Sequence, residues 1–492
     1  MIKLPDANLY GAALEKYLHD EVWGKLADER NRLEGFQKWV RGNQDVPQIA
    51  AQHVNTERQA LQNISRSPWM GLMVKTFAQQ LIVDGYRKSG STDNADAWKT
   101  WKRNDMHAQQ FTLNRDILTY GYSYVKVVDS EDPITGEQMA SIRVKSPKMV
   151  CALYEDPFFD EWPKYVLERQ PNGQYYWWSD EDYVVLDHKG GGDFTAVDIV
   201  EHDYGLVPFV RYTNDVDDDG RCWGDVEPVI EVAKRIDKTR FDMLLTQHFT
   251  GFIIRWATGL QQPDTDPDVE KMKVKLSQSG ILISSNKDAK FGTLPPGPMD
   301  GLIEAYRESL KDFLSLTQMP PNIAGQIVNV AADALAAGTR PTMQKLYEKQ
   351  AMFAVGHNRV MRLVNIIENR MDDAADVDMS IHWQDVEIKS LAQFADAWGK
   401  MVQQLKIPAW GVWPMIPNID QSTVQGWMDN AAPEGMEFIE YIRMLQESGP
   451  AGRGGAAGMD PRGGPNNALN QQSPNNRNGE PASLNKQQPG AR

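Results

Sequence analysis

Cysteine is nearly absent from this sequence of 492 residues, which contains only Cys151 and Cys222. So few cysteines exclude a disulfide-rich secreted scaffold and are typical of a protein from a reducing compartment. Uncharged apolar runs are also short, and none approaches the roughly 18 residues that a membrane-spanning helix needs. The opening segment MIKLPDANLYGAALEKYLHDE lacks the apolar stretch of a signal peptide. We therefore expect neither a membrane span nor a secretion signal.

Basic residues are in short supply as well. The chain has 52 Lys and Arg against 67 Asp and Glu, a formal net charge of −15. This balance disfavours a protein that grips DNA over its whole surface, although it permits local contact, because phosphate neutralisation needs many cationic side chains. With 41% apolar and 24% charged residues, the body has the composition of an ordinary globular protein with room for several domains.

The usual catalytic signatures are missing too. No GxxxxGK[ST] phosphate loop, HExxH, CxxC or G-x-S-x-G motif occurs, and the eight histidines show no ligand spacing. Gly190, Gly191 and Gly192 follow a predicted strand without matching a dinucleotide-binding pattern, so we interpret them as a turn. These absences predict no catalytic residues, no metal site and no cofactor.

One acidic segment partly matches a calcium-binding loop. The residues from Asp215 to Gly220 have the pattern D-x-D-x-D-G, but the twelfth position holds Val226 where the loop needs a bidentate Glu. We interpret the segment as an acidic turn. The alternative is a metal-dependent hydrolase or nuclease that uses Asp215, Asp217 and Asp219.

Two further patterns have a nucleic-acid interpretation beside a structural one. The aromatic residues from Tyr175 to Trp178 are of a type that stacks on bases, yet no basic residues are interleaved, which favours a buried strand. Lys271, Lys273 and Lys275 alternate with apolar residues and suit either phosphate contact or the solvated face of an edge strand.

Periodicity divides the chain into helical and β-rich parts. Residues 7–118 are mostly helical, with Leu14, Leu18, Val22 and Leu26 on one face and a further helix expected over 95–118. Residues 120–212 contain six to eight short strands, and Pro171-Asn172-Gly173 predicts a hairpin turn. Together these parts predict an α+β fold.

The second half of the chain is predominantly helical. A helix is predicted over 224–250, a small β excursion over 251–298 with strands at 271–276 and 281–285, and a second helix over 302–316. An uncharged loop-like segment at 317–332 precedes a long helical pattern over 333–371, interrupted by Gly338 and Pro341. Helices continue through 387–448. Residues 449–492 are rich in Gly, Pro, Asn and Gln and lack aromatic residues, so we expect a disordered tail.

The order of these segments resembles the portal proteins of tailed bacteriophages, specifically the group from long-tailed phages. The likeness covers roughly residues 10–450. The segments that carry it are ERNRLEGFQKWVRGNQ, RSPWMGLMVKTFAQQLIVDGYR, WKRNDMHAQQFTLNRDILTYGYSYVKV, RCWGDVEPVIEVAKRIDKTRFDML and MPPNIAGQIVNVAADALAAGTRP with KLYEKQAMF. The chain departs from a Ser-Gly/Ala-Glu-Ala-Leu-Arg-like motif of many relatives at residues 332–338, although Arg340 is close to the usual arginine position.

The resemblance implies a portal fold with named parts. It comprises a β-rich wing, a stem of two helices, a small β clip between them, a tunnel loop, a long kinked helix and a helical crown. Laid on this sequence, these parts are the wing 1–220, the stem helix 221–250, the clip 251–298, the second stem helix 299–316, the tunnel loop 317–332, the kinked helix with a return to the wing 333–384, the crown 385–448 and the tail 449–492.

The resemblance also implies a function and partners. Portals form a ring, usually dodecameric, at one capsid vertex, through which DNA is packaged and ejected. The implied partners are double-stranded DNA, the terminase motor, a head-completion or adaptor protein, and the major capsid and scaffold proteins. The protein would reside in the virion, and in the host cytoplasm during assembly.

The resemblance also implies site residues. Those that would line the channel are Gln318, Asn322, Gln326 and Asn329. Those that would supply basic channel or clip contacts are Lys271, Lys273, Lys275 and Arg340. Another ring-forming tail protein stays open as an alternative.

Overall fold

The computed structural model describes most of the first 406 residues and little beyond them. The described residues are 2–45, 56–89, 94–132, 134–202, 204–250, 255–258, 290–293, 299–320, 323, 332–384, 391–406, 412–413, 416 and 426–427. The chain divides into two compact units, Met1–Gln425 and Gly426–Arg492, and the helices and strands with defined bounds belong to the first.

A long N-terminal helical segment covers one face of a sheet. Helix α1 (Gly11–Tyr17) continues through a π-helical stretch (Leu18–Trp23) into α2 (Gly24–Arg41). The predicted apolar face is confirmed, because Leu14, Leu18, Val22 and Leu26 are all buried and pack with Tyr175 and Trp177 of the sheet. Burial of these side chains is the main force that fixes the helix on the sheet.

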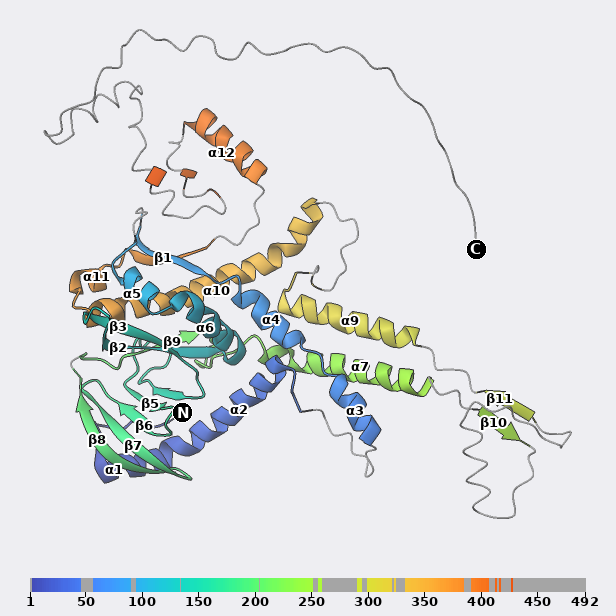
Figure 1. The fold of residues 1–492 in the computed structure, drawn as a ribbon, viewed down its shortest axis with the longest axis horizontal. Helices are drawn as coiled ribbons and strands as arrows, with labels where there is room; N and C mark the ends of the chain where they lie inside the picture. The colour runs from blue at the N-terminus through green and yellow to red at the C-terminus, as the bar shows by residue number, and fades with distance from the viewer. Residues whose placement is uncertain are drawn as a thin grey trace, which may run out of the picture. The chain divides into compact units, whose positions relative to one another are not determined.

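The β-rich part forms two antiparallel sheets, as Figure 1 shows. The first has the order β3–β2–β9, and the second is a meander from β4 to β8. Their bounds are β2 Tyr122–Glu131, β3 Gln138–Lys145, β9 Phe209–Thr213, β4 Val150–Leu153, β5 Tyr165–Arg169, β6 Tyr175–Trp178, β7 Asp182–Gly190 and β8 Asp193–Glu201. The predicted hairpin turn is confirmed between β5 and β6, where Gly173 adopts a φ of 92°.

The helical stretch expected over 95–118 is confirmed, but it is divided into two helices. The structure has α5 (Ala97–Arg103) and α6 (Met106–Tyr120), separated by Asp105 in the left-handed region at φ 52°. The cause is Asn104, whose side-chain amide donates to the Ala140 carbonyl while its oxygen accepts the Ile142 N–H. Asn104 therefore bonds to strand β3, and this tertiary contact ends the helix.

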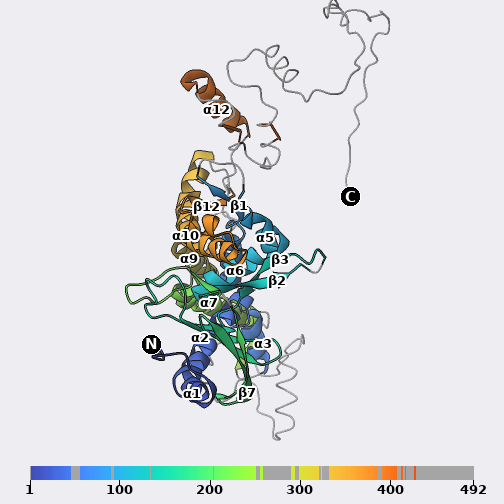
Figure 2. The ribbon, with the colours of Figure 1, turned by 90° about the vertical axis from the view of Figure 1, so that its left-hand side faces the viewer.

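Residues far apart in the sequence close the largest core. Strand β1 (Val83–Lys88) pairs antiparallel with β12 (Met379–Trp383), and helix α4 (Trp69–Ala78) packs on α2 and α6. Helices α3 (Thr56–Ile64) and α11 (Met371–Ala375) complete this part of the chain. In Figures 1 and 2 the long helix α10 lies beside α5 and β12, in agreement with its contacts.

Helix α10 (Ala332–Ile367) bears out the long helical pattern. It runs through Gly338 and Pro341, and Figure 1 shows it bent, as expected for a helix with an internal proline. The helix ends at Ile367 and not at Met371, because Asn369 adopts a left-handed φ of 57° before α11 begins.

Two helices bracket the predicted β excursion. Helix α7 (Ile230–Thr250) follows a 3₁₀ turn at Glu227–Val229, so the expected helix start at 221–224 is wrong. Helix α9 (Asp300–Thr317) packs beside α7 (Figure 1), and the chain between them contains the strand pair β10 (Arg255–Thr258) and β11 (Lys290–Thr293). The strands expected at 271–276 and 281–285 lie outside the described residues.

The region after β12 is described only in part. Helix α12 (Leu391–Leu405) confirms the helix expected after residue 387. Of the helices expected from there to residue 448, the structure describes only residues 412–413, 416 and 426–427, and the tail 449–492 falls outside the described residues. In the part of the chain that the structure describes, no helix is long and apolar enough to cross a membrane.

Candidate functional site

Helices α7 and α9 pack through apolar side chains and an ion pair. Ile236 on α7 and Leu310, Phe313 and Leu314 on α9 are buried in the main core. Arg235 pairs with Asp312 across the two helices at the surface. The helix pair is therefore fixed to the body at one end by hydrophobic burial.

Asp237 ties α7 to the N-terminal helices. Its carboxylate accepts the Gln44 side-chain amide at 2.6 Å and the Ser67 backbone N–H at 2.8 Å. Burial raises the pKa of Asp237 above its usual value, although these hydrogen bonds oppose the shift. The contact sets how α7 leaves the junction of α2 and α4.

Three buried charges join α10 to the start of α7. The Asp225 carboxylate pairs with Lys345 at 2.8 Å and Lys349 at 3.1 Å, and it also accepts the Asn214 amide at 2.9 Å. The Asp225 side chain is only 8% exposed. Burial alone would raise the pKa of Asp225, but the two lysines outweigh it and hold the pKa below its ordinary value.

The same stretch of α10 also holds the end of α9. Lys345 donates to the Thr317 carbonyl at 3.2 Å, and the Thr342 hydroxyl donates to the Gln318 carbonyl at 2.7 Å. Carbonyl groups at a helix C-terminus have no partner within the helix, so α10 satisfies two of them. One side of α10 thus binds both the end of α9 and Asp225, which precedes α7. We name the set Asp225, Thr342, Lys345 and Lys349 the α10 clamp.

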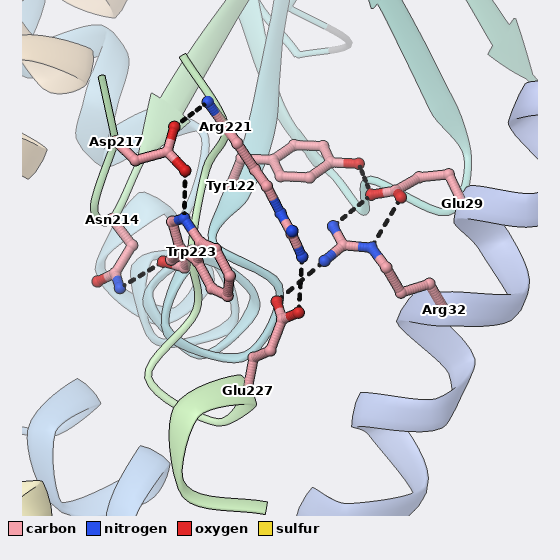
Figure 3. A network of polar contacts seen from close by, with 8 residues as sticks. All are labelled: Glu29, Arg32, Tyr122, Asn214, Asp217, Arg221, Trp223 and Glu227. Atoms are coloured by element: carbon pink, nitrogen blue, oxygen red, sulfur yellow. Dashed lines mark hydrogen bonds and ion pairs between the residues drawn. The ribbon is translucent and has the colours of Figure 1, made fainter. Parts of the chain in front are cut away.

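A second polar network lies where α2, β2 and the acidic turn meet, as Figure 3 shows. Arg32 pairs with Glu29 at 2.8 Å and with Glu227 at 3.0 Å, and Arg221 pairs with the other oxygen of Glu227 at 2.7 Å. The Tyr122 hydroxyl donates to Glu29 at 2.8 Å. This network orients the 3₁₀ turn that precedes α7.

The structure describes two of the residues predicted to contact DNA. Gln318 is exposed at the C-terminal end of α9, with a left-handed φ of 55°, and Arg340 is exposed on α10. Both lie close to the α10 clamp, because Thr342 bonds the Gln318 carbonyl. The other predicted contacts, Asn322, Gln326, Asn329, Lys271, Lys273 and Lys275, lie outside the described residues.

The calcium-like segment forms a turn in which the Asp217 carboxylate is hydrogen-bonded by nearby backbone and side-chain groups of the same segment. Asp217 accepts the backbone N–H groups of Asp219 and Arg221 and, at 2.8 Å, the indole N–H of Trp223 (Figure 3). These contacts, led by that of Trp223, lower the pKa of Asp217. Among the described residues, no group of three or more His, Cys, Asp or Glu side chains is placed to hold a metal ion.

We expect Asp217→Ala to loosen this turn without changing calcium binding, because its carboxylate already serves three protein donors. Isothermal titration of the wild type, Asp217→Ala and the exposed control Asp218→Ala with CaCl₂ checks this expectation. A calcium affinity present in the wild type and lost only in Asp217→Ala would reverse the interpretation and revive the metal-dependent alternative.

The aromatic segment 175–178 is strand β6, and its side chains point mainly into protein. Tyr175, Trp177 and Trp178 are buried, with Trp177 stacked on Tyr165. Trp178 donates its indole N–H to Glu168, which also pairs with Lys126 and Lys145. The structural interpretation of this segment is confirmed.

Sequence reasoning missed the α10 clamp entirely. Its members come from two segments more than 100 residues apart, and no motif links them. The one available signal is the spacing of Lys345 and Lys349, four residues apart on a helix and therefore on one face. Leu346 and Phe353, close to these lysines on the helix, are buried. Two cations beside buried residues predict a buried anion, but they do not identify which residue supplies it.

Comparison with known proteins gives one family match. The family described as "Phage portal protein, SPP1 Gp6-like" matches residues 19–438. Comparison with curated protein sequences gave no match.

Three solved structures are similar at low sequence identity. The first, "Virion of native gene transfer agent (GTA) particle", has a TM-score of 0.41 and 10% identity, and covers 77% of this chain and 95% of its own. The second, "Neck of empty GTA particle computed with C6 symmetry", has a TM-score of 0.43 and 10% identity, with coverages of 75% and 96%. The third, "Neck of native GTA particle computed with C12 symmetry", has a TM-score of 0.43 and 11% identity, with coverages of 73% and 93%.

Proposed function

This chain belongs to the SPP1 Gp6-like family of phage portal proteins, and we propose that twelve copies of it form a closed ring at one capsid vertex. The family match over residues 19–438 is the observation that carries the proposal. Under it, double-stranded DNA passes through the ring during packaging and ejection, and the protein is part of the virion after assembly in the host cytoplasm.

The arrangement of elements supports an assignment of parts. Helices α7 and α9 are the stem, and the chain between them, with β10 and β11, is the clip. The two sheets with the N-terminal helices are the wing, residues 317–332 the tunnel loop, and residues 385–448 the crown. On this assignment the α10 clamp lies where the stem, the tunnel loop and the long helix join.

Exposed apolar side chains on the stem support ring formation. Leu316 on α9 is 61% exposed, and Leu244 and Leu245 on α7 are only partly buried within one subunit. Large apolar side chains of this kind are typical of protein interfaces. In a closed ring each subunit uses two different surfaces, so these residues would pack against the neighbouring stem.

The proposed contacts between the channel and DNA are weak. DNA must slide, so firm phosphate binding would hinder transport, and an acidic body repels the duplex. Gln318, Asn322, Gln326 and Asn329 would touch the DNA backbone without holding it. Lys271, Lys273, Lys275 and Arg340 would supply basic contacts in the clip or channel.

The protein acts as a structural part rather than as an enzyme under this proposal. ATP hydrolysis belongs to a separate terminase motor, since the sequence has no phosphate-binding loop. The clip would meet the motor and later the head-completion protein, and the wing would meet the capsid and scaffold proteins.

Purified protein viewed by negative-stain electron microscopy, with native mass spectrometry on the same sample, tests the ring. We expect particles with a central hole and a mass of twelve subunits, because exposed stem side chains become buried only on assembly. Since scaffold protein sometimes drives assembly, a second sample includes it. A single subunit in both samples would contradict the proposal.

A further inference from the structure

A cleft of about 560 Å³ opens where the N-terminal helices meet both sheets. Its walls come from α2, β2, β4, β9 and the turn before α7. A volume of this size is within the range of small-molecule sites, roughly 300–1,000 Å³. The portal assignment gives this cleft no role.

The cleft is basic although the chain is acidic. Lys25, Arg32, Arg211 and Arg221 line it, and Glu29 is the carboxylate among the lining residues. Arg32 and Arg221 are already engaged, since both pair with Glu227 and Arg32 also pairs with Glu29 (Figure 3). Positive charge therefore remains on one side of the cleft, chiefly at Arg211.

Arg211 has no carboxylate partner among the described residues. One of its Nη2 N–H groups donates to the Pro157 carbonyl, and the guanidinium lies 4.3 Å from the centre of the Tyr154 ring. A guanidinium carries five N–H donors, so most of them have no protein acceptor in this part of the chain. A half-buried guanidinium with such donors can bind an anion through charge-assisted hydrogen bonds.

Tyr124 supplies a second donor in the cleft. Its side chain is only 4% exposed and forms part of the cleft wall. Burial raises the pKa of Tyr124, which keeps the hydroxyl protonated at neutral pH. A tyrosine hydroxyl in the wall of a cleft can donate a hydrogen bond to a ligand oxygen.

Part of the remaining wall is apolar. Ile2, Leu26, Val150 and Ala152 line the cleft beside Pro147. Apolar walls with a few convergent polar groups are the usual composition of sites for organic molecules. We propose that this cleft binds a small organic anion, whose phosphate or carboxylate group meets Arg211 and the Tyr124 hydroxyl while its apolar body contacts these walls.

Isothermal titration of the full-length protein tests the proposal with three probes: phenyl phosphate, benzoate and inorganic phosphate. We expect one of the two organic probes to bind at one site per subunit and inorganic phosphate to bind more weakly. Preference for phenyl phosphate identifies a phosphate ligand, and preference for benzoate identifies a carboxylate. No heat from either organic probe at millimolar concentration, or equal affinity for inorganic phosphate, overturns the proposal.

Variants locate the site. Arg211→Gln is expected to weaken binding of the organic probe about tenfold or more, and Tyr124→Phe about threefold, because a charged hydrogen bond contributes more than a neutral one. Arg143→Gln, at an exposed position on β3, is the control and should bind as the wild type does. Unchanged affinity in Arg211→Gln overturns the proposal. Should that variant fail to fold by circular dichroism, Tyr124→Phe decides, since it keeps the packing of the ring, and unchanged affinity there overturns it.

Discussion

Asp225→Asn is expected to lower the free energy of unfolding by about 3–5 kcal/mol, which is the usual cost of removing one partner of a buried ion pair. The substitution leaves Lys345 and Lys349 buried beside each other without an anion. Urea denaturation followed by far-UV circular dichroism at pH 7 measures the change. The conservative asparagine keeps the volume of the side chain, so the effect reports charge and not packing.

The same variant should show a defined pH dependence. The pKa of Asp225 is lowered in the folded protein, so its contribution is complete above the unfolded value of about 4 and is lost as the pH falls through the folded value. The difference between wild type and variant should therefore shrink below pH 4. Asp242→Asn removes an exposed partner of Lys238 on α7 and is the control, with an expected cost below about 1 kcal/mol. Equal effects of the two variants would show that the α10 clamp does not stabilise the fold.

Phe313→Ala is expected to cost about 3–5 kcal/mol, because it removes a fully buried aromatic ring and leaves a cavity. Phe313 lies on α9 and joins the main core, so its loss weakens the attachment of the helix pair to the body. Chemical denaturation gives the stability change. Negative-stain images of the same variant are expected to show fewer complete rings, since α7 and α9, the proposed stem, would lose their fixed direction.

Leu316→Ala is the matched control for Phe313→Ala. Leu316 is on the same helix but largely exposed within one subunit, so its truncation should change monomer stability by less than about 0.5 kcal/mol. Similar destabilisation by both variants would contradict the packing described for α9. Loss of rings in Leu316→Ala with unchanged monomer stability would place this side chain at the interface between stems.

Local patterns in the sequence predicted much of the fold. The four-residue spacing from Leu14 to Leu26 identified a buried helix face, and Pro171-Asn172-Gly173 identified a hairpin, because both features depend on neighbours in sequence. The order of segments also identified the family. The break at Asn104 was missed because its cause, strand β3, lies nearly forty residues later.

The candidate site was harder to predict than the fold. Gln318 and Arg340 were selected by resemblance to the family. Only the structure shows that they lie near the α10 clamp, through the hydrogen bond from Thr342 to the Gln318 carbonyl. No sequence pattern singled out Asp225, since its lysine partners are over 100 residues away. Likewise, nothing in the sequence joins Tyr124, Arg211 and Ile2 in one cleft, because three separate chain segments must fold together first.

The pairing of β1 with β12 has a consequence for synthesis of the chain. Val83 finds its partner Trp383 only after some 300 further residues have been made, which at about 5–20 residues per second takes roughly 15–60 s. Throughout that time the N–H and C=O groups of β1 that will pair with β12 have no β12 to bond to. An unpaired strand edge of this kind can associate with other chains. The charged Arg87 and Lys88 at its end oppose such association, so translation speed and chaperone supply are expected to affect the yield of native subunits.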